Sequence, residues 1–324
     1  MITKVRVEDP RKSDEAKKAW LAERSKSIGG SEIGTILGLN PYSSPFKLWA
    51  ERTGKIPAFE GNLRTEVGSY LEQCVADIFT AQTGIQVQKT NFIWRNDLYP
   101  VLHATPDRLC VGRRAGLEIK TTSTFNVKQF HGEEFPSQYY AQCVQYMAVC
   151  ELNEWFLAVL VGNSEFHIYQ LVRDREIPKL EQAQCCLYVD ESEINALNEA
   201  AENFWDMVLA DKPPVPDGSE ATAEVIDQMY PAGSGTIELF GRENLFEEYK
   251  LLKTDSDKLE KRMEAIKNII KADMGDAELA TCGPYKCTWK SQNKSTFDKK
   301  RCIAEHPEMA KYESSKPVRV FLMK

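Results

Sequence analysis

The chain has 324 residues, of which 42% are hydrophobic and 27% are charged, and its formal net charge is −7. This composition is typical of a soluble globular protein with one large domain, or with a domain and an extension. Its apolar runs are too short for a membrane span, and the charged segment 1–20 lacks the pattern of a signal peptide.

The nine cysteines include no C-x-x-C pair, and the four histidines do not cluster with them. This pattern disfavours a zinc site or a disulfide framework and favours reduced thiols in a cytosolic protein. Charge is spread unevenly, because residues 190–242 hold twelve acidic and two basic residues, a local net charge of −10. The rest of the chain therefore has a net charge of +3. This composition is compatible with a basic groove that binds nucleic acid.

Helical patterns dominate the first part of the chain. Four helices are predicted, at 14–26, 29–38, 44–54 and 64–82. Ser31 is the expected N-cap of the second helix, and Gly84 is expected to end the fourth. The fourth helix has apolar residues at helical spacing: Val67, Leu71, Cys74, Ile78 and Phe79.

Strand patterns follow the fourth helix, and further helices lie among them. Five strands are predicted, at 85–94, 102–112, 115–123, 154–162 and 165–173. The segments 137–150 and 176–210 are predicted to be helical. The segments 112–116 and 162–164 have the composition of hairpin turns. This order predicts an α/β fold with a mixed central sheet flanked by helices.

A Pro- and Gly-rich stretch divides the chain, and we expect a main domain at 1–212 and a C-terminal extension at 213–324. The extension is predicted to contain a long helix at 243–272 and closing strands at 284–292 and 318–324. Apolar residues at 249, 252, 259, 263, 266 and 270 give the helix a heptad-like seam, interrupted by Ser256. Packing of this seam within its own chain is the first interpretation.

Acidic residues on two neighbouring strands form the candidate chemical site. Strand alternation places Glu118 and Lys120 on one face and Leu117 and Ile119 on the other. A hairpin closed at 112–116 brings Asp107 beside Glu118. Two carboxylates this close repel each other unless a cation lies between them, and hard oxygen ligands suit Mg²⁺ or Mn²⁺.

Two helices supply further candidates. Glu72 shares a stripe with Val75 and Phe79, so it is expected at the edge of the buried face of helix 64–82, with Glu66 as the competing acid. The apolar helix 137–150 carries one polar stripe, formed by Gln138, Gln142 and Gln145. Neutral amides there are suited to binding a metal-bound water or a phosphate without adding negative charge.

Another candidate site lies near the N-terminus. The backbone N–H groups of Gly29 and Gly30, next to Ser31 and preceded by Arg24, are suited to binding an anion. Each feature also has an ordinary structural explanation: a turn aspartate, a solvent-facing strand pair, a surface helix acid, glutamines satisfied within the core, or a glycine turn. The chain has no P-loop motif, which disfavours an NTPase.

Several motifs in order give the chain a family resemblance. The segments "RSKSIGGSEIGTILGLNPYSSPFKLWAERTG", "LEQCVADIF", "ATPDRL", "LEIKTT" and "YYAQCVQYMAV" resemble the phage exonuclease family that includes lambda exonuclease and the YqaJ-type viral recombinases. These belong to the PD-(D/E)xK nuclease superfamily. The resemblance covers about residues 20–165. It implies a restriction-endonuclease-like core and a Mg²⁺-dependent exonuclease, which digests linear duplex DNA from the 5′ end and leaves a 3′ overhang.

The resemblance also suggests roles for particular residues. Asp107, Glu118 and Lys120 match the nuclease signature, and Glu72 matches a helix-borne metal ligand. Besides these, Gln142 matches the glutamine near the active site, and Tyr139 precedes it at the family spacing. Arg24 and Ser31 match positions that hold the 5′-terminal phosphate, and Arg24, Ser31 and Tyr139 are the predicted DNA-binding residues. The predicted metal ligands are Glu72, Asp107, Glu118 and the carbonyl of Ile119. The predicted catalytic residues are Asp107, Glu118, Lys120 and Gln142.

The same resemblance implies partners and a setting. They are double-stranded DNA ends, a single-strand annealing protein and a homo-oligomer, with a ring-shaped trimer favoured, in the cytoplasm of a bacterial host and encoded by a phage or prophage. Two alternatives stay open: a structure-specific or restriction-type endonuclease on the same core, and a non-catalytic DNA-binding or assembly protein. The extension could mediate oligomerisation, cover a DNA channel or dock a partner.

Overall fold

The computed structural model describes residues 1–293, 295–314 and 319–323. It divides into two compact units, Met1–Met229 and Tyr230–Lys324. Helix α7 (Glu220–Met229) packs on α3 (Pro45–Arg52) within the first unit, so this unit extends past the predicted boundary at residue 212.

Two sheets form the framework of the first unit. A six-stranded mixed sheet has the order β10-β9-β8-β7-β6-β3, and a four-stranded sheet has the order β1-β4-β5-β2. Within the mixed sheet, β7 and β8 are parallel, as are β9 and β10, and the other neighbours are antiparallel. The strands are β1 (Ile2–Arg6), β2 (Ile28–Gly29), β3 (Val87–Lys89), β4 (Phe92–Asn96), β5 (Leu102–Ala104), β6 (Arg108–Cys110), β7 (Ala115–Thr122), β8 (Glu154–Val161), β9 (Glu165–Val172) and β10 (Cys186–Tyr188).

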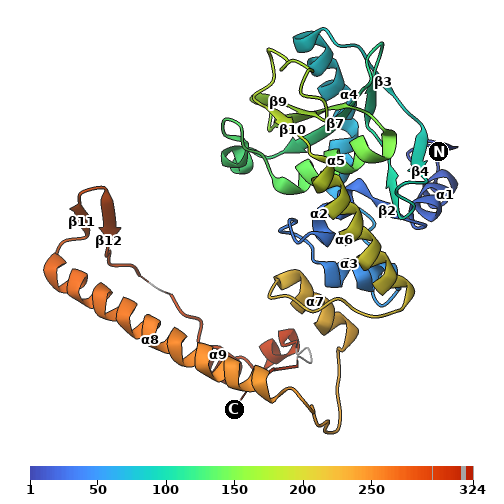
Figure 1. Cartoon of the computed structure of the whole chain (residues 1–324). Helices are drawn as coiled ribbons and strands as arrows, with labels where there is room; N and C mark the ends of the chain where they lie inside the picture. Colours follow the sequence, from blue (N-terminus) through green and yellow to red (C-terminus); the bar gives the residue numbers. More distant parts are fainter. Residues whose placement is uncertain (294, 315–318, 324) are drawn as a thin grey trace. The chain divides into compact units, whose positions relative to one another are not determined.

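Helices cover both faces of the mixed sheet (Figure 1). Alternate residues of β8 belong to two separate hydrophobic clusters. Trp155 and Leu157 share one cluster with α5, while Phe156 and Ala158 share the other with α4. The remaining helices of this unit are α1 (Asp14–Arg24), α2 (Gly30–Ile36), α4 (Leu63–Thr83), the 3₁₀ helix η1 (Thr124–Phe130), α5 (Ser137–Cys150) and α6 (Glu191–Leu209). The central strands are therefore buried on both faces, as expected for an α/β sheet.

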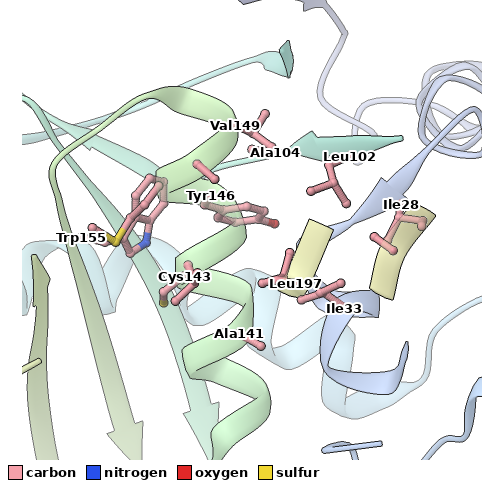
Figure 2. Close-up of a cluster of buried hydrophobic side chains, with 14 of the residues drawn as sticks. Ile28, Ile33, Leu102, Ala104, Ala141, Cys143, Tyr146, Val149, Trp155 and Leu197 are labelled. Carbon is pink, nitrogen blue, oxygen red and sulfur yellow. The ribbon is translucent and has the colours of Figure 1, made fainter. Parts of the chain in front are cut away.

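Helix α5 is the centre of the larger cluster. All ten residues from 141 to 150 are buried, and Figure 2 shows Tyr146 of α5 among side chains from β2, α2, β5 and α6. Helix α2 crosses α5 so closely that a Cβ on Gly30 would lie 2.3 Å from the Tyr146 ring. Only glycine fits there, so the "GG" pair permits a close helix contact.

The second unit is built on one long helix, α8 (Glu243–Met274). A two-stranded hairpin follows it, made of β11 (Leu279–Cys282) and β12 (Tyr285–Thr288), and then come α9 (Lys299–Glu305) and the 3₁₀ helix η2 (Pro307–Tyr312). The strand predicted at 318–324 is wrong for residues 319–323, which form no strand, and residues 318 and 324 lie outside the described residues.

The predicted fold class is confirmed: an α/β unit with mixed sheets flanked by helices, followed by a helix and a hairpin. Two predicted strands are wrong in their extent. Segment 85–94 divides into β3 and the start of β4, and segment 102–112 divides into β5 and β6, with one part in each sheet. Segment 176–210 is helical only from Glu191, because β10 precedes the helix and pairs with β9.

Within the described residues, we find no helix that combines the length and the apolar character needed to cross a membrane.

Candidate active site

Strand β7 presents two different faces, as its alternation predicts. Leu117 and Ile119 are buried in the cluster under α4. Glu118 points to the opposite face, where Gln142 of α5 donates to it. Lys120 donates from Nζ to Oε1 of Glu118 at 2.6 Å. The two charged residues therefore form a linked pair under α5.

The β6–β7 hairpin brings Asp107 to this pair. The register places Arg108 opposite Leu117, so the next pair outward is Asp107 and Glu118. Asp107 Oδ2 accepts a hydrogen bond from the backbone N–H of Ile119 at 2.8 Å. Asp107 directly precedes β6, where the chain passes from one sheet to the other. The aspartate therefore lies at a break in the strand, close to a buried carboxylate.

The two carboxylate oxygens of Glu118 have different environments. Oε1 accepts from Lys120 and from Gln142, each at 2.6 Å, whereas Oε2 is buried and has no hydrogen-bond partner among the residues that the structure describes. Gln142 also donates to the hydroxyl of Tyr146 at 3.2 Å. A buried carboxylate oxygen without a partner is costly. The face of Glu118 turned away from Lys120 is thus free to bind a cation.

Burial and mutual repulsion determine the acid–base state of the site. Burial raises the pKa of Asp107 well above its usual value, the Glu118 carboxylate raises it further, and Lys120 opposes both. Burial also raises the pKa of Glu118, again opposed by Lys120. Burial lowers the pKa of Lys120, but the Glu118 and Asp107 carboxylates outweigh this effect and raise it above its usual value. The single positive charge of Lys120 does not balance the two buried carboxylates of Asp107 and Glu118. A second positive charge beside them would therefore stabilise the ionised pair.

Glu72 lies at the edge of the buried face of α4, where the sequence predicts it, while Glu66 is fully on the surface. Its carboxylate forms an ion pair with Arg108, which is only 3% exposed. Arg108 also donates to the Asp107 carbonyl oxygen at 2.7 Å and to Gln73 Oε1 at 3.1 Å. Glu72 therefore adjoins the two acids through Arg108.

The donor set fits a hard divalent cation at Asp107 and Glu118. Both are carboxylates, one of their oxygens is buried without a partner, and the Ile119 carbonyl lies on the strand between Glu118 and Lys120. Within residues 1–293, 295–314 and 319–323, however, no three Asp, Glu, His or Cys side chains are grouped closely enough to hold a metal ion. The third acid, Glu72, is ion-paired with Arg108.

The three glutamines of α5 have separate environments. Gln142 lies in the site, but Gln145 donates to the backbone carbonyls of Ile28 and His103 at 3.0 and 2.9 Å and so joins β2 to β5. Gln138 lies half-buried against Gly34. The predicted polar stripe thus contributes one site residue and one core residue. On the preceding turn, Tyr139 is half-buried, with Lys120 Nζ 5.3 Å from its ring centre.

Arg24 and Ser31 lie together at the start of α2, with Arg24 Nη2 3.5 Å from Ser31 Oγ. The prediction that Ser31 is the N-cap is wrong: Gly29 occupies that position in an extended conformation. The backbone N–H of Gly29 donates to Glu32 Oε2 at 2.8 Å, so a residue within the helix caps it. Ser31 is consequently exposed and its hydroxyl is not used as a cap.

Sequence reasoning missed two buried residues of this region. Arg108 follows Asp107 directly, and a charged residue inside a three-residue strand was the available signal. His103 is completely buried in β5. Its Nδ1 lies 2.9 Å from Ser27 Oγ, while its Nε2 has no partner within residues 1–293, 295–314 and 319–323. Burial and nearby arginines, Arg24 first among them, hold its pKa well below the usual value.

Comparison with known proteins places this arrangement in a family. Residues 19–153 match the YqaJ-like viral recombinase domain. The chain is 33% identical over 312 residues to the uncharacterized protein YqaJ of Bacillus subtilis (strain 168), over 94% of this chain and 92% of the relative. The chain belongs to the YqaJ-like viral recombinase family. The matched range contains every site residue considered above, from Arg24 to Gln142.

Two solved structures to which this chain is similar are named as exonucleases. One is the alkaline exonuclease LHK-Exo from Laribacter hongkongensis, with a TM-score of 0.48 and 16% identity, over 60% of this chain and 93% of that chain. Another is a phage-related exonuclease from Haemophilus somnus 129PT, with a TM-score of 0.41 and 13% identity, over 57% of this chain and 96% of that chain.

Proposed function

We propose that this YqaJ-family chain is a Mg²⁺-dependent exonuclease that digests the 5′-ended strand of linear double-stranded DNA and leaves 3′ single-stranded overhangs. One observation carries the proposal: the hairpin register sets Asp107 beside Glu118, and Lys120 and Gln142 donate to one oxygen of Glu118 while the other has no partner in the described part of the chain. The two carboxylates can bind a metal ion on one side, and the Lys120 ammonium group lies on the other side. Such an arrangement suits metal-dependent phosphodiester hydrolysis.

Each residue has a defined task in this proposal. Asp107, Glu118 and the Ile119 carbonyl would hold the ion, with Glu72 as a third acid released from Arg108. Bound Mg²⁺ supplies charge stabilisation at the phosphate and an activated water, and Mn²⁺ could substitute for it. The ammonium group of Lys120, which donates to Glu118 Oε1, would stabilise negative charge that develops on the phosphate. Gln142 holds the Glu118 carboxylate in its orientation.

The region around Arg24 would determine the polarity of digestion. Arg24 and the exposed hydroxyl of Ser31 lie together at the glycine pair, and both are donors suited to a terminal phosphate. Tyr139 lies beside Lys120 with a ring that can contact a nucleotide. A 5′-phosphate bound at Arg24 and Ser31 would restrict the enzyme to strand ends.

Membership of a viral recombinase family supports the biological setting. We assign the chain to recombination encoded by a phage or prophage, in the cytoplasm of a bacterial host. A single-strand annealing protein would take up the 3′ overhang. A ring-shaped homotrimer would hold the duplex during digestion.

Digestion of defined DNA substrates tests the activity. With Mg²⁺, we expect a 5′-phosphorylated linear duplex to be degraded from its 5′ ends, a 5′-hydroxyl duplex to be degraded more slowly, and a covalently closed circle to stay intact. Cleavage of the closed circle would establish an endonuclease instead. No cleavage of any substrate would indicate a non-catalytic DNA-binding protein.

Two substitutions test the site. Lys120→Ala should keep DNA binding but slow cleavage by about a thousandfold or more, because the transition-state charge loses its nearest cation. Asp107→Ala should abolish Mg²⁺-dependent cleavage. Lys18→Ala, an exposed residue of α1, is the matched control and should digest DNA at the wild-type rate. Full activity of Lys120→Ala would refute the assigned role.

A further inference from the structure

Helix α8 carries an apolar stripe that the described residues of its own unit, Tyr230–Lys324, leave exposed. Its members alternate in spacing between three and four residues, interrupted once by Ser256: Leu245, Tyr249, Leu252, Leu259, Met263, Ile266 and Ile270. Their side chains are between 41% exposed, at Ile270, and 66% exposed, at Leu259. Met274 at the C-terminal end is the one buried α8 residue in the described part of the chain. Within the described residues of the second unit, the seam therefore has no packing partner, and its packing against the rest of the chain stays a prediction.

This stripe matches itself when a second α8 runs in the opposite direction. When a two-fold axis passes between Asp257 and Lys258 and relates the two antiparallel helices, every seam position of one helix faces a seam position of the other. The resulting layers, each formed twice, are Leu245 with Ile270, Tyr249 with Ile266, Leu252 with Met263, and Ser256 with Leu259 of the other helix. The apolar contact would extend over roughly 37 Å at a rise of 1.5 Å per residue. Heptad seams of this length are typical of stable coiled coils.

Charges beside the seam also match in the antiparallel arrangement. In antiparallel coiled coils, residues flanking the seam on the same side of each helix face one another. This brings Asp255 opposite Arg262 of the second helix and Lys253 opposite Glu260 of the second helix. Each pair has opposite signs and occurs twice about the axis. At both ends, the next seam position pairs Arg242 with Asp273 of the other helix.

A parallel pair of the same helices does not match. Parallel pairing in register would put Asp255 near Glu260 and Arg262 near Lys267, with like charges in both cases. At the ends of the seam, Arg242 would face its own copy, as would Asp273. Only Glu248 and Lys253 would attract. Charge complementarity therefore selects one orientation, as it does in natural coiled coils.

We propose that α8 is a self-association surface, occupied by α8 of a second copy of this chain in an antiparallel coiled coil. This gives the extension a role independent of the nuclease site, since all its contacts lie in the second unit. Burial of the seam stabilises the pair, and the charges beside it determine the direction.

Subunit number of the full-length protein provides the first test. Light scattering or sedimentation should give the wild type twice as many subunits as Leu259→Asp/Met263→Asp, whatever assembly the first units form. Leu251→Asp is the matched control: its side chain is 63% exposed but off the seam, so its subunit number should equal that of the wild type. Equal subunit numbers for the wild type and the seam variant, or a ratio of three, would overturn the proposal. Unchanged helix content by circular dichroism shows that the variants fold.

Charge reversal provides the second test and determines the direction. Asp255→Arg and Arg262→Asp, taken singly, should each weaken association by about tenfold, because two exposed attractive pairs become repulsive. The double variant should associate like the wild type. In a parallel pair, each single reversal would instead remove a repulsion. Tighter association of the single variants, or no recovery in the double variant, would refute antiparallel pairing.

Discussion

Glu118 and Glu72 are acids of the same type with opposite surroundings. Glu118 is 2% exposed, and one of its oxygens has no partner among the described residues, whereas Glu72 is half-buried and forms an ion pair with Arg108. The hairpin register explains the difference. Successive side chains point to opposite faces of the sheet, so Asp107 lies beside Glu118 and Arg108 points toward α4. One arginine, placed by strand alternation, therefore separates the third acid from the other two.

Replacement of Glu72 by glutamine tests both of its connections. Glu72→Gln leaves buried Arg108 without a carboxylate, so the free energy of unfolding should fall by about 1–3 kcal/mol. If Glu72 also binds the ion, the Mg²⁺ concentration for half-maximal cleavage should rise by about tenfold. Denaturant unfolding and a Mg²⁺ titration of cleavage measure the two effects. We expect both.

Glu66→Gln is the control for this experiment, because Glu66 is exposed on the same helix and should alter neither quantity. A lower stability of Glu72→Gln with an unchanged Mg²⁺ requirement would show that Glu72 serves Arg108 alone.

His103 should make stability depend on pH. Burial and nearby arginines hold its folded-state pKa well below 6.5, so only the unfolded chain takes up this proton at mildly acidic pH. Its contribution is therefore complete above about pH 6.5 and is lost as pH falls, by up to about 1.4 kcal/mol per pH unit. His103→Gln should lower stability at pH 7 but flatten the decline between pH 7 and pH 5. Denaturant unfolding at both pH values measures this.

The exposed histidine His131 supplies the comparison, since His131→Gln should keep the wild-type pH dependence. A decline in His103→Gln as steep as in the wild type would mean that other groups cause the acid sensitivity.

At the scale of single elements, helices with clear ends could be predicted from sequence. Gly84 ends α4 in the left-handed conformation, and Ser44 caps α3 through a hydrogen bond to the Lys47 N–H. The buried face of α4 is less accurately predicted. Val67 and Cys74 are exposed, while Val75, Ala76 and Phe79 are buried, so the face that packs on the sheet is rotated from the predicted one.

Strand extent could not be predicted in the same way. Apolar alternation indicates an extended segment but not the sheet that each part joins, so 85–94 and 102–112 each read as one strand. Pro106 was the available signal, because proline cannot donate within a ladder and often marks a strand break. The break between β5 and β6 positions Asp107. The predicted strand 102–112 is therefore wrong at the residue that the candidate site depends on.

The site itself was partly predictable because its core is local. Glu118, Lys120 and Asp107 lie on one hairpin, and turn composition determines which residues face each other. The ion pair of Glu72 with Arg108 and the bonding of Gln145 across β2 and β5 depend on how distant elements pack. Sequence periodicity carries no information about such partners.

At the scale of the whole chain, the two units carry separate features. The candidate site lies entirely in Met1–Met229, and the apolar α8 seam lies in Tyr230–Lys324. Helix α7 belongs to the first unit through Val225, which is 1% exposed, and through Thr222 Oγ1, which donates to Ser44 Oγ at 2.8 Å. Residues beyond the predicted boundary at 212 therefore complete the core around α3.

Two truncations separate these contributions. A chain ending at Met229 keeps every core contact of the first unit, so it should fold, retain Mg²⁺-dependent DNA cleavage per subunit and contain half as many subunits as the full chain. A chain ending at residue 212 loses the burial of Val225 and the Thr222–Ser44 hydrogen bond, which should lower the free energy of unfolding by about 3 kcal/mol relative to 1–229. Denaturant unfolding, cleavage assays and light scattering measure the three properties.

Equal stability of the two truncated chains would move the boundary of the first unit back to residue 212. Inactivity of a folded 1–229 chain would mean that cleavage requires the second unit.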